Sequence, residues 1–447
     1  MTNIGIIGLG TMGYSLYLHL REDGLECVPY SYNAEELKKV DGHCPESLNT
    51  FINSLATPRR VLLMITAGPA VDEVLNDLVA CLDAGDTIID GGNSHYIDSE
   101  RRISQLANET GIHYICCGIS GGAEGARNGA ALMPSGATAA LNGCEDVFQS
   151  LAAIHDGQRC YASMGGGAAG HFVKMVHNGI EYALMQLIAE VYGLLHTGYN
   201  WDRAEIRSFF GQLAGSPSRS YLLEITNDIL DTTSAEGELV LEGISDRAAQ
   251  NGTGRFASDA AMELGVAIPS INAAVTERYL SKDIRGIAPD ALEKTSHALP
   301  SSTIMAAYNT LALVIYAQGI ELIRAGSAKH NWQIPVPEVV RVWQGGCIIR
   351  AHVLTEIKHK LHLNKGAHLI EIFKDCLNFH QCQQISANMM MAAVPSPVTA
   401  ATVNYLLSLS SRELPTNLVQ AQRDYFGDHG FERKGATGQY HADWVRQ

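Results

Sequence analysis

The 447-residue chain is short of positive charge, since 32 lysine and arginine residues face 47 aspartate and glutamate residues and give a formal net charge of −15. This balance argues against a partner such as nucleic acid or an acidic membrane surface. An anionic ligand must therefore be held by local cations. We find no apolar run of about 18 residues that could span a membrane and no secretory leader pattern, so we expect a cytoplasmic protein.

The cysteines lack the patterns of a disulfide framework or a zinc site. The ten cysteines include no C-x-x-C pair. Cys116 and Cys117 lie in an apolar stretch typical of a buried strand, so we interpret them as reduced core residues. The group Cys376, His380 and Cys382 has neither metal-ligand spacing nor a fourth ligand. We therefore expect no bound metal.

The amino terminus carries a dinucleotide-binding fingerprint. An apolar, strand-like run is followed by Gly8, Gly10 and Gly13 in a G-x-G-x-x-G arrangement, and then by apolar residues at helical spacing. Such a turn lets a pyrophosphate approach the backbone at a helix amino terminus. We therefore predict a nicotinamide cofactor contacted by Gly8, Leu9, Gly10, Thr11, Met12 and Gly13.

The first 160 residues have the rhythm of a Rossmann-type α/β domain. Apolar runs predict parallel strands at 27–32, 60–65, 87–90 and 113–117. Ligands of such sheets bind beyond the carboxyl ends of the strands, here at the glycine-rich loops 66–68, 90–94 and 118–129. From these loops we expect cofactor contacts at Ile65, Thr66, Ala67 and Asn93. Asn93 and Ser120, with the N–H groups near Gly121 and Gly122, could hold a carboxylate or hydroxyls against the nicotinamide ring.

A segment from His171 to Tyr182 places polar side chains at helical spacing in an apolar stretch. Five of these side chains follow the spacing i, i+3, i+4, i+7, i+8, so on a helix they would all lie on one face. They are Lys174, His177, Asn178, Glu181 and Tyr182. A desolvated lysine can act as a base and a nearby carboxyl group can return a proton. A buried salt bridge with polar neighbours explains the same pattern, so both interpretations stay open on these residues alone.

Beyond Gly170 the glycine-rich strand rhythm gives way to helical periodicity. We predict helices at 172–195, 255–264, 303–323 and 384–407. The expected organisation is a dinucleotide-binding domain at 1–168, an all-helical substrate and dimerisation domain with two similar halves at 169–426, and a polar tail at 427–447.

Four motifs, in order along the chain, resemble those of the decarboxylating 6-phosphogluconate dehydrogenase family. They are IIDGGNS, GISGGAEGARNG followed by LMP, HFVKMVHNGIEY and QAQRDYFGDHGFER. The resemblance covers essentially the whole chain. It implies that Lys174 takes the proton from the carbon-3 hydroxyl during hydride transfer, and that Glu181 protonates carbon 1 after carbon dioxide leaves.

The resemblance also implies how the sugar acid is held. Its carboxylate and hydroxyls would contact Asn93, Ser120, Gly121, Gly122, His177 and Asn178. Its distal phosphate would contact Tyr182, Thr253 and Arg278, with Asn251 where the family has a lysine. Arg423 and His429 match a pair that reaches the phosphate of the neighbouring subunit, so a homodimer is implied.

Several departures from the family pattern remove positive charge. Where the family usually has Asn-Arg-Thr after the second strand, this chain has Asn33, Ala34 and Glu35. The arginine that would pair with a 2′-phosphate is missing, and Glu35 lies near the distance at which an acid accepts from ribose hydroxyls. We therefore expect NAD rather than NADP, although another basic side chain could compensate. Tyr30 or Tyr32 could cover the adenine.

Because Asn251 replaces the lysine that the family places against the substrate phosphate, the identity of the group on carbon 6 of the substrate stays open. A 6-phosphogluconate-like acid is the first expectation, and the same chemistry on a 6-sulfogluconate or an unphosphorylated aldonate with NAD is an alternative. Another 3-hydroxy acid would be a related substrate. A non-catalytic dinucleotide-binding protein is the remaining alternative, and it would have no need to keep both Lys174 and Glu181.

Overall fold

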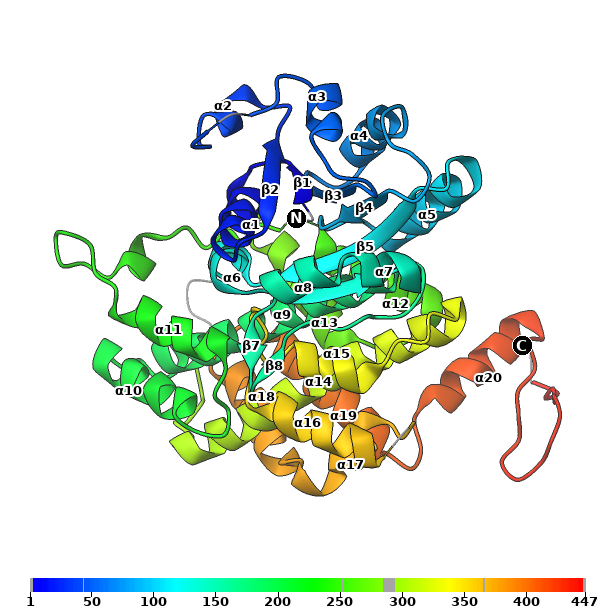
Figure 1. Cartoon of the computed structure of the whole chain (residues 1–447). Helices are drawn as coiled ribbons and strands as arrows, with labels where there is room; N and C mark the ends of the chain where they lie inside the picture. The colour runs from blue at the N-terminus through cyan, green and yellow to red at the C-terminus, as the bar shows by residue number, and fades with distance from the viewer. Residues whose placement is uncertain (1–2, 43, 251, 284–293, 365, 445–447) are drawn as a thin grey trace. The chain divides into compact units, whose positions relative to one another are not determined.

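The structure, a computed structural model, describes residues 3–42, 44–250, 252–283, 294–364 and 366–444. Contacts divide the chain into two units, Met1–Thr402 and Val403–Gln447. The first unit opens with a six-stranded sheet in the order β2-β1-β3-β4-β5-β6 (Figure 1). Its strands are β1 Asn3–Ile7, β2 Glu26–Tyr30, β3 Arg60–Leu63, β4 Thr87–Asp90, β5 His113–Ser120 and β6 Ala131–Ser135.

Helices link these strands and cover the sheet, so the predicted Rossmann-type domain is confirmed. They are α1 Thr11–Glu22, α2 Ala34–Leu37, α3 Leu48–Asn53, α4 Pro69–Val79, α5 Tyr96–Glu109, α6 Gly122–Asn128, α7 Thr138–Gly143 and α8 Glu145–Leu151. The sheet is parallel from β2 to β5, but β6 runs antiparallel to β5. The prediction of a single loop over 118–129 was wrong, because β5 continues to Ser120 and α6 follows it. A two-stranded sheet, β7 Ile154–His155 and β8 Gln158–Arg159, ends this part.

The remainder of the chain is helical, as the loss of strand rhythm predicted. Its helices are α9 Ala169–Gly193, α10 Arg203–Ala214, α11 Tyr221–Asp231, α12 Thr253–Leu264, α13 Pro269–Leu280, α14 Ser301–His330, α15 Val336–Val342, α16 Val353–Leu363, α17 Leu369–Phe373, α18 Phe379–Met391, α19 Pro397–Ser410 and α20 Thr416–Gly427. Short π or 3₁₀ turns are η1 Leu194–Gly198, η2 Val240–Gly243 and η3 Lys374–Cys376.

One predicted helix, 384–407, is in fact two. Helix α18 ends at Met391 and α19 begins at Pro397. Between them Ala393 adopts a positive φ of 56°. Pro395 and Pro397 explain the break, since proline has no N–H for a continuing helix and pushes the residue before it out of helical geometry.

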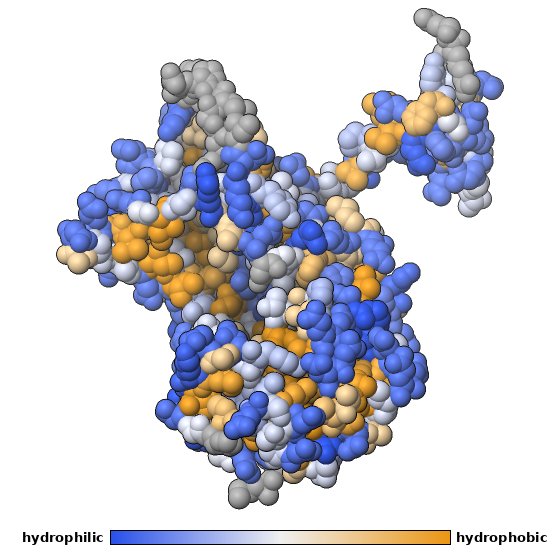
Figure 2. Space-filling view, turned by 90° about the horizontal axis from the view of Figure 1, so that it is seen from above, coloured by the Kyte–Doolittle hydropathy of each residue, from blue (hydrophilic) through white to orange (hydrophobic). Residues whose placement is uncertain are grey.

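Helix α14 is long and apolar enough to span a membrane by length and composition, so the expectation of no such apolar run was wrong. Its most apolar window is 78% buried inside the protein, as in the core helix of a globular domain. On the face shown in Figure 2, hydrophobic residues form patches within a largely hydrophilic surface. The most exposed large hydrophobic residues of the first unit are Met262, Met390 and Leu363.

Helix α9 crosses the sheet at unusually short range. A Cβ on Gly118 of β5 would lie 2.5 Å from Cβ of Lys174. A Cβ on Gly170, in the first turn of α9, would lie 2.2 Å from the carbonyl oxygen of Met133 and 2.3 Å from that of Cys116. The two glycines therefore let the backbones of helix and sheet come into direct contact, with Lys174 held at the crossing.

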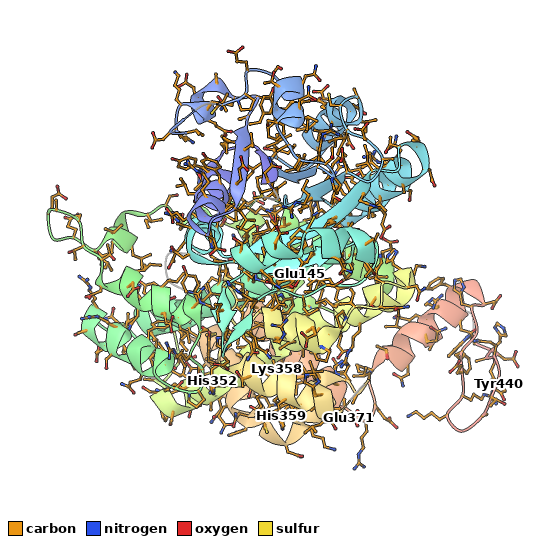
Figure 3. The ribbon with its side chains drawn as sticks, viewed as in Figure 1. Glu145, His352, Lys358, His359, Glu371 and Tyr440 are labelled. Carbon is orange, nitrogen blue, oxygen red and sulfur yellow. The ribbon has the colours of Figure 1, made fainter. Side chains whose placement is uncertain are left out.

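The second unit has its own buried acid. The side chain of Asp424, on α20, is fully buried and accepts from the N–H of Gly430 (2.9 Å), the Nε1–H of Trp444 (2.8 Å) and Nδ1 of His441 (2.8 Å). Burial by itself raises the pKa of this carboxyl group, but the hydrogen bonds together outweigh that effect and lower the pKa to about 2. Tyr440, labelled in Figure 3, pairs with Phe431 in an antiparallel bridge. The polar tail is thus folded back along α20.

From the close crossing of α9 over the sheet we predict how a substitution at Gly170 changes the stability of the fold. Gly170→Ala should lower the free energy of unfolding by about 1–3 kcal/mol, because the methyl group would overlap two carbonyl oxygens in a packed core. The matched change Gly143→Ala, in α7, has no atom within 4 Å and should be neutral or stabilising by up to about 1 kcal/mol. Thermal unfolding of both variants tests this. Equal melting temperatures would contradict the close crossing.

Candidate active site

The residues predicted on one face of α9 do come together, with Ser120 and Thr253 beside them. His177 contacts Oγ of Ser120 through Nε2 (3.1 Å) and lies 3.8 Å from a carboxylate oxygen of Glu181 through Nδ1. Asn178 donates to Oγ1 of Thr253 (3.1 Å). Side chains from β5, α9 and α12 therefore meet along this face of α9, where Lys174, which is 7% exposed, affects His177 and Glu181 electrostatically.

Burial shifts the pKa values of this group in opposite directions. It lowers the pKa of the Lys174 amine, partly offset by the negative charge of Glu181. It raises the pKa of the Glu181 carboxyl group, partly offset by Lys174 and Arg278. The pKa of His177 is well below its usual value because of burial and the nearby Lys174. Both shifts favour the neutral form of the group, which for the Lys174 amine is the form that accepts a proton and for the Glu181 carboxyl group is the form that donates one.

A second cluster adjoins this group at Tyr182. The guanidinium carbon of Arg278 lies 3.7 Å from the centre of the Tyr182 ring, and Nη1 of Arg278 donates to the carbonyl of Ala249 (2.8 Å). Gly254 lets α12 approach, since a Cβ there would lie 2.6 Å from the ring. Tyr182, Arg278 and the start of α12 at Thr253 therefore lie close together, and their binding of a shared ligand group stays a prediction. Asn251 falls outside the described residues.

Two cavities follow the predicted cofactor loops. One, of about 550 Å³, is lined by eight of the predicted residues: Gly10, Thr11, Met12, Gly13, Ile65, Thr66, Ala67 and Asn93. The other, of about 500 Å³, lies beside Gly8 and is also lined by Asn33. Sequence reasoning missed His95, which precedes α5, and Phe256, on α12, because an isolated histidine or phenylalanine has no motif of its own.

The fingerprint turn fits a pyrophosphate. Gly8 has a φ of +94°, and a Cβ on Gly13 would lie 2.0 Å from the Gly8 carbonyl, so both positions require glycine. Helix α1 has no side-chain cap and no acid in its first turn. Its amino-terminal N–H groups therefore face the cavity as an anion site.

Comparison with known proteins agrees with this geometry. Residues 3–166 match the family model described as the NAD binding domain of 6-phosphogluconate dehydrogenase, and residues 170–444 match that of the 6-phosphogluconate dehydrogenase C-terminal domain. The decarboxylating 6-phosphogluconate dehydrogenase of Lactococcus lactis subsp. lactis is 36% identical over 477 residues, covering 100% of this chain and 99% of that protein. That of Staphylococcus epidermidis is 37% identical, covering 99% of each.

The chain belongs to the 6-phosphogluconate dehydrogenase family.

A solved structure of another 6-phosphogluconate dehydrogenase supports the assignment. The Plasmodium falciparum enzyme, described in its apo form and in complex with its cofactor NADP⁺ and its substrate 6-phosphogluconate, superimposes with a TM-score of 0.92 at 33% identity. The match covers 99% of this chain and 100% of that one. The Rossmann-type domain and the helical domain of this family member are thus both those of a nicotinamide-dinucleotide-dependent dehydrogenase.

The segment after β2 differs from the sequence expectation. Strand β2 ends at Tyr30, and the cavity is lined by Ser31, Tyr32, Asn33 and Glu36 but not by Ala34 or Glu35. Glu35 instead pairs with Lys38 in solvent (2.6 Å). Because Asn33 caps the short helix α2, the next two side chains turn outward and Glu36 turns inward. The acid that faces the fingerprint is therefore one residue later than predicted.

Glu36 is held against the fingerprint turn. One of its carboxylate oxygens accepts from the N–H of Leu9 (2.8 Å) and from the hydroxyl of Ser31 (2.7 Å). Leu9, whose side chain is fully buried, thus takes part through its backbone. Of the two tyrosines considered for the adenine, Tyr32 lines the cavity, whereas Tyr30 stacks on Phe51.

The predicted pair Arg423 and His429 lies in the second unit of this family member. Arg423, on α20, donates to Gln420 (3.1 Å), and the ring of His429 lies 5.9 Å from that of Phe426. Their contact with a neighbouring subunit stays a prediction.

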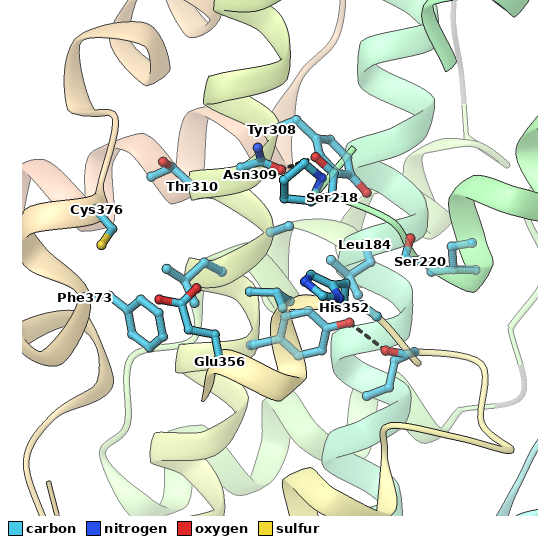
Figure 4. A pocket seen from close by; sticks show the side chains of 18 of the residues that line it. Leu184, Ser218, Ser220, Tyr308, Asn309, Thr310, His352, Glu356, Phe373 and Cys376 are labelled. Carbon is cyan, nitrogen blue, oxygen red and sulfur yellow. Dashed lines mark hydrogen bonds between the residues drawn. The ribbon is translucent and has the colours of Figure 1, made fainter. Parts of the chain in front are cut away.

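A further cavity, of about 290 Å³, lies between α9, α14 and α16 (Figure 4). Leu184, Tyr308, His352 and Glu356 project into it. Its described lining includes none of the predicted substrate or cofactor residues. The cavity is therefore separate from the chemistry at Lys174.

Proposed function

We propose that this chain oxidises and decarboxylates 6-phosphogluconate to a ketopentose phosphate and carbon dioxide, with NAD as the hydride acceptor. The carrying observation is the placement of Lys174 and Glu181 on one face of α9, where burial lowers the pKa of the amine and raises that of the carboxyl group. The curated relatives named for this reaction support the substrate.

In this mechanism the dinucleotide, when bound, supplies the acceptor for hydride. Neutral Lys174 removes the proton from the carbon-3 hydroxyl, and the resulting ammonium polarises the new ketone while the carboxylate at carbon 1 leaves as carbon dioxide. Glu181, in its protonated form, then donates a proton to carbon 1 of the enediol. The lowered amine pKa keeps the base active at lower pH, and the raised carboxyl pKa keeps the acid protonated at higher pH.

We also propose the residues that hold the substrate. Asn93, Ser120, Gly121, Gly122, His177 and Asn178 bind the carboxylate and hydroxyls. Tyr182, Thr253 and Arg278 bind the distal phosphate, joined by Asn251 and, in a homodimer, by Arg423 and His429 of the partner subunit.

The preference for NAD rests on charge. The cavity beside Gly8, of about 500 Å³, would hold the adenosine part of the dinucleotide. The described residues that line it include the acids Glu36, Glu73 and Asp77 and no lysine or arginine. A 2′-phosphate, with close to two negative charges, would be repelled there, whereas a ribose hydroxyl can donate to Glu36. This supports NAD over NADP.

A steady-state absorbance assay tests the substrate and the base together. Turnover should be highest with 6-phosphogluconate and NAD, compared with 6-deoxy-6-sulfogluconate, gluconate and NADP. Lys174→Met should abolish hydride transfer while dinucleotide binding persists, because the base is lost and the cavity is intact. Lys329→Met, an exposed lysine on α14, is the matched control and should keep wild-type activity.

Preference for the sulfonate or gluconate would replace the proposed substrate. No turnover with any pair would favour another 3-hydroxy acid or a non-catalytic dinucleotide-binding role, and activity in Lys174→Met would rule out the proposed base.

Neighbouring acids allow a sharp test of cofactor choice. Glu36→Gln should lower the ratio of kcat/KM for NAD to that for NADP by about tenfold, since hydrogen bonds to a charged group contribute roughly 1.5–3 kcal/mol. Glu35→Gln removes the same charge one residue earlier but in solvent, and should leave the ratio unchanged. A larger change in Glu35→Gln than in Glu36→Gln would mean that the discriminating acid has been misidentified.

A further inference from the structure

His171 is a buried polar residue of α9 that the proposed mechanism leaves unused. It is 2% exposed and lies one helical turn before Lys174. Its Nε2 lies 3.0 Å from the carbonyl oxygen of Asp90, and its Nδ1 lies 2.7 Å from Oγ of Ser99. It therefore links the helix that carries the proposed base to the last residue of β4 and to α5.

The tautomer of His171 follows from its partners. A carbonyl oxygen can only accept, so Nε2 carries the hydrogen and donates it to Asp90. Nδ1 then accepts from the Ser99 hydroxyl, which at 2.7 Å is closer to Nδ1 than to its other possible acceptor, the carbonyl oxygen of His95 (3.1 Å). Burial lowers the pKa of His171, which agrees with a neutral ring making one donated and one accepted bond.

Asp90 is also the anchor of the loop that follows β4. Its fully buried carboxylate accepts from the N–H of Gly92 (3.0 Å), from Oγ of Ser94 (2.6 Å) and from the hydroxyl of Tyr114 (2.6 Å). Gly92 and Ser94 flank Asn93, which lines the dinucleotide cavity. The position of Asp90 therefore sets the position of Asn93.

Arg102, 1% exposed, extends this network to the neighbouring loop. Its guanidinium donates to Oγ of Ser94 (3.3 Å), to the carbonyl of Gly68 (3.0 Å) and to Asp72 (2.9 and 3.0 Å). The loops after β3 and β4, which form one wall of the cavity, are thus fixed to each other. The hydrogen bond between His171 and the carbonyl of Asp90 connects these two loops to α9.

We propose that His171 is a positioning residue that holds the amine of Lys174 in register with the Asn93 loop, and so with the reacting carbon between them. This inference rests on the proposed function of the site. A displacement of about 1 Å between reacting groups can cost about 100-fold in rate, so a single fixed hydrogen bond between the two elements has a kinetic consequence.

Two substitutions of His171 distinguish the effect of losing the hydrogen bond to Asp90 from the effect of losing the imidazole ring. A glutamine amide nitrogen can occupy the place of Nε2 and still donate to Asp90, whereas an asparagine is too short. His171→Asn should lower kcat by about 10–100-fold with the dinucleotide dissociation constant within about twofold of wild type. His171→Gln should recover most of kcat. Ser99→Ala, which removes only the Nδ1 partner, should lower kcat by a few-fold at most.

Backbone amide hydrogen exchange gives a second readout that needs no substrate. His171→Asn should speed exchange at Gly92 and Ser94 by about tenfold, without changing exchange in β3, and His171→Gln should restore it. Unchanged kcat and exchange in His171→Asn, or equal loss in both variants, would overturn the proposal. If wild-type protein turns over none of the sugar acids, the proposed function fails, and the exchange result alone then decides the role of His171.

Discussion

The close crossing of α9 over β5 and β6 is the constraint on which the site depends. Gly118 and Gly170 remove the side chains that would separate the two backbones. Lys174 is therefore buried against the carboxyl-terminal part of β5, on the side of the sheet where the loops that line the dinucleotide cavity begin. A Rossmann-type sheet alone would bind the cofactor, and a helical domain alone would bury the amine, but the crossing brings both to one place.

Burial at this crossing also sets the acid–base chemistry. An amine and a carboxyl group two turns apart on one face of the same helix are both removed from water, so the charged form of each is disfavoured and their pKa values move toward each other. The two proton transfers need neither a metal ion nor a proton donor or acceptor from another domain. The buried imidazole of His171, in the first turn of the same helix, is hydrogen-bonded to the carbonyl of Asp90 at the end of β4.

Motifs with fixed spacing were predictable from the sequence, and features decided by tertiary contacts were not. The fingerprint turn, four strands and the polar face of α9 follow from local patterns, and the structure has them. The antiparallel strand β6 and the break between α18 and α19 were missed, since short apolar runs do not reveal direction and a long periodicity can hide Pro395 and Pro397. Glu36 was missed in favour of Glu35 because the cap at Asn33 decides which acid turns inward.

The most direct measurement is the ratio of carbon dioxide released to dinucleotide reduced, using 6-phosphogluconate labelled with ¹⁴C at carbon 1. If α9 supplies both the base and the acid, wild-type protein should release one labelled carbon dioxide for each dinucleotide reduced. Dinucleotide reduction with the label retained in the product would contradict the account, because the site would then be a simple dehydrogenase that stops at the 3-keto acid.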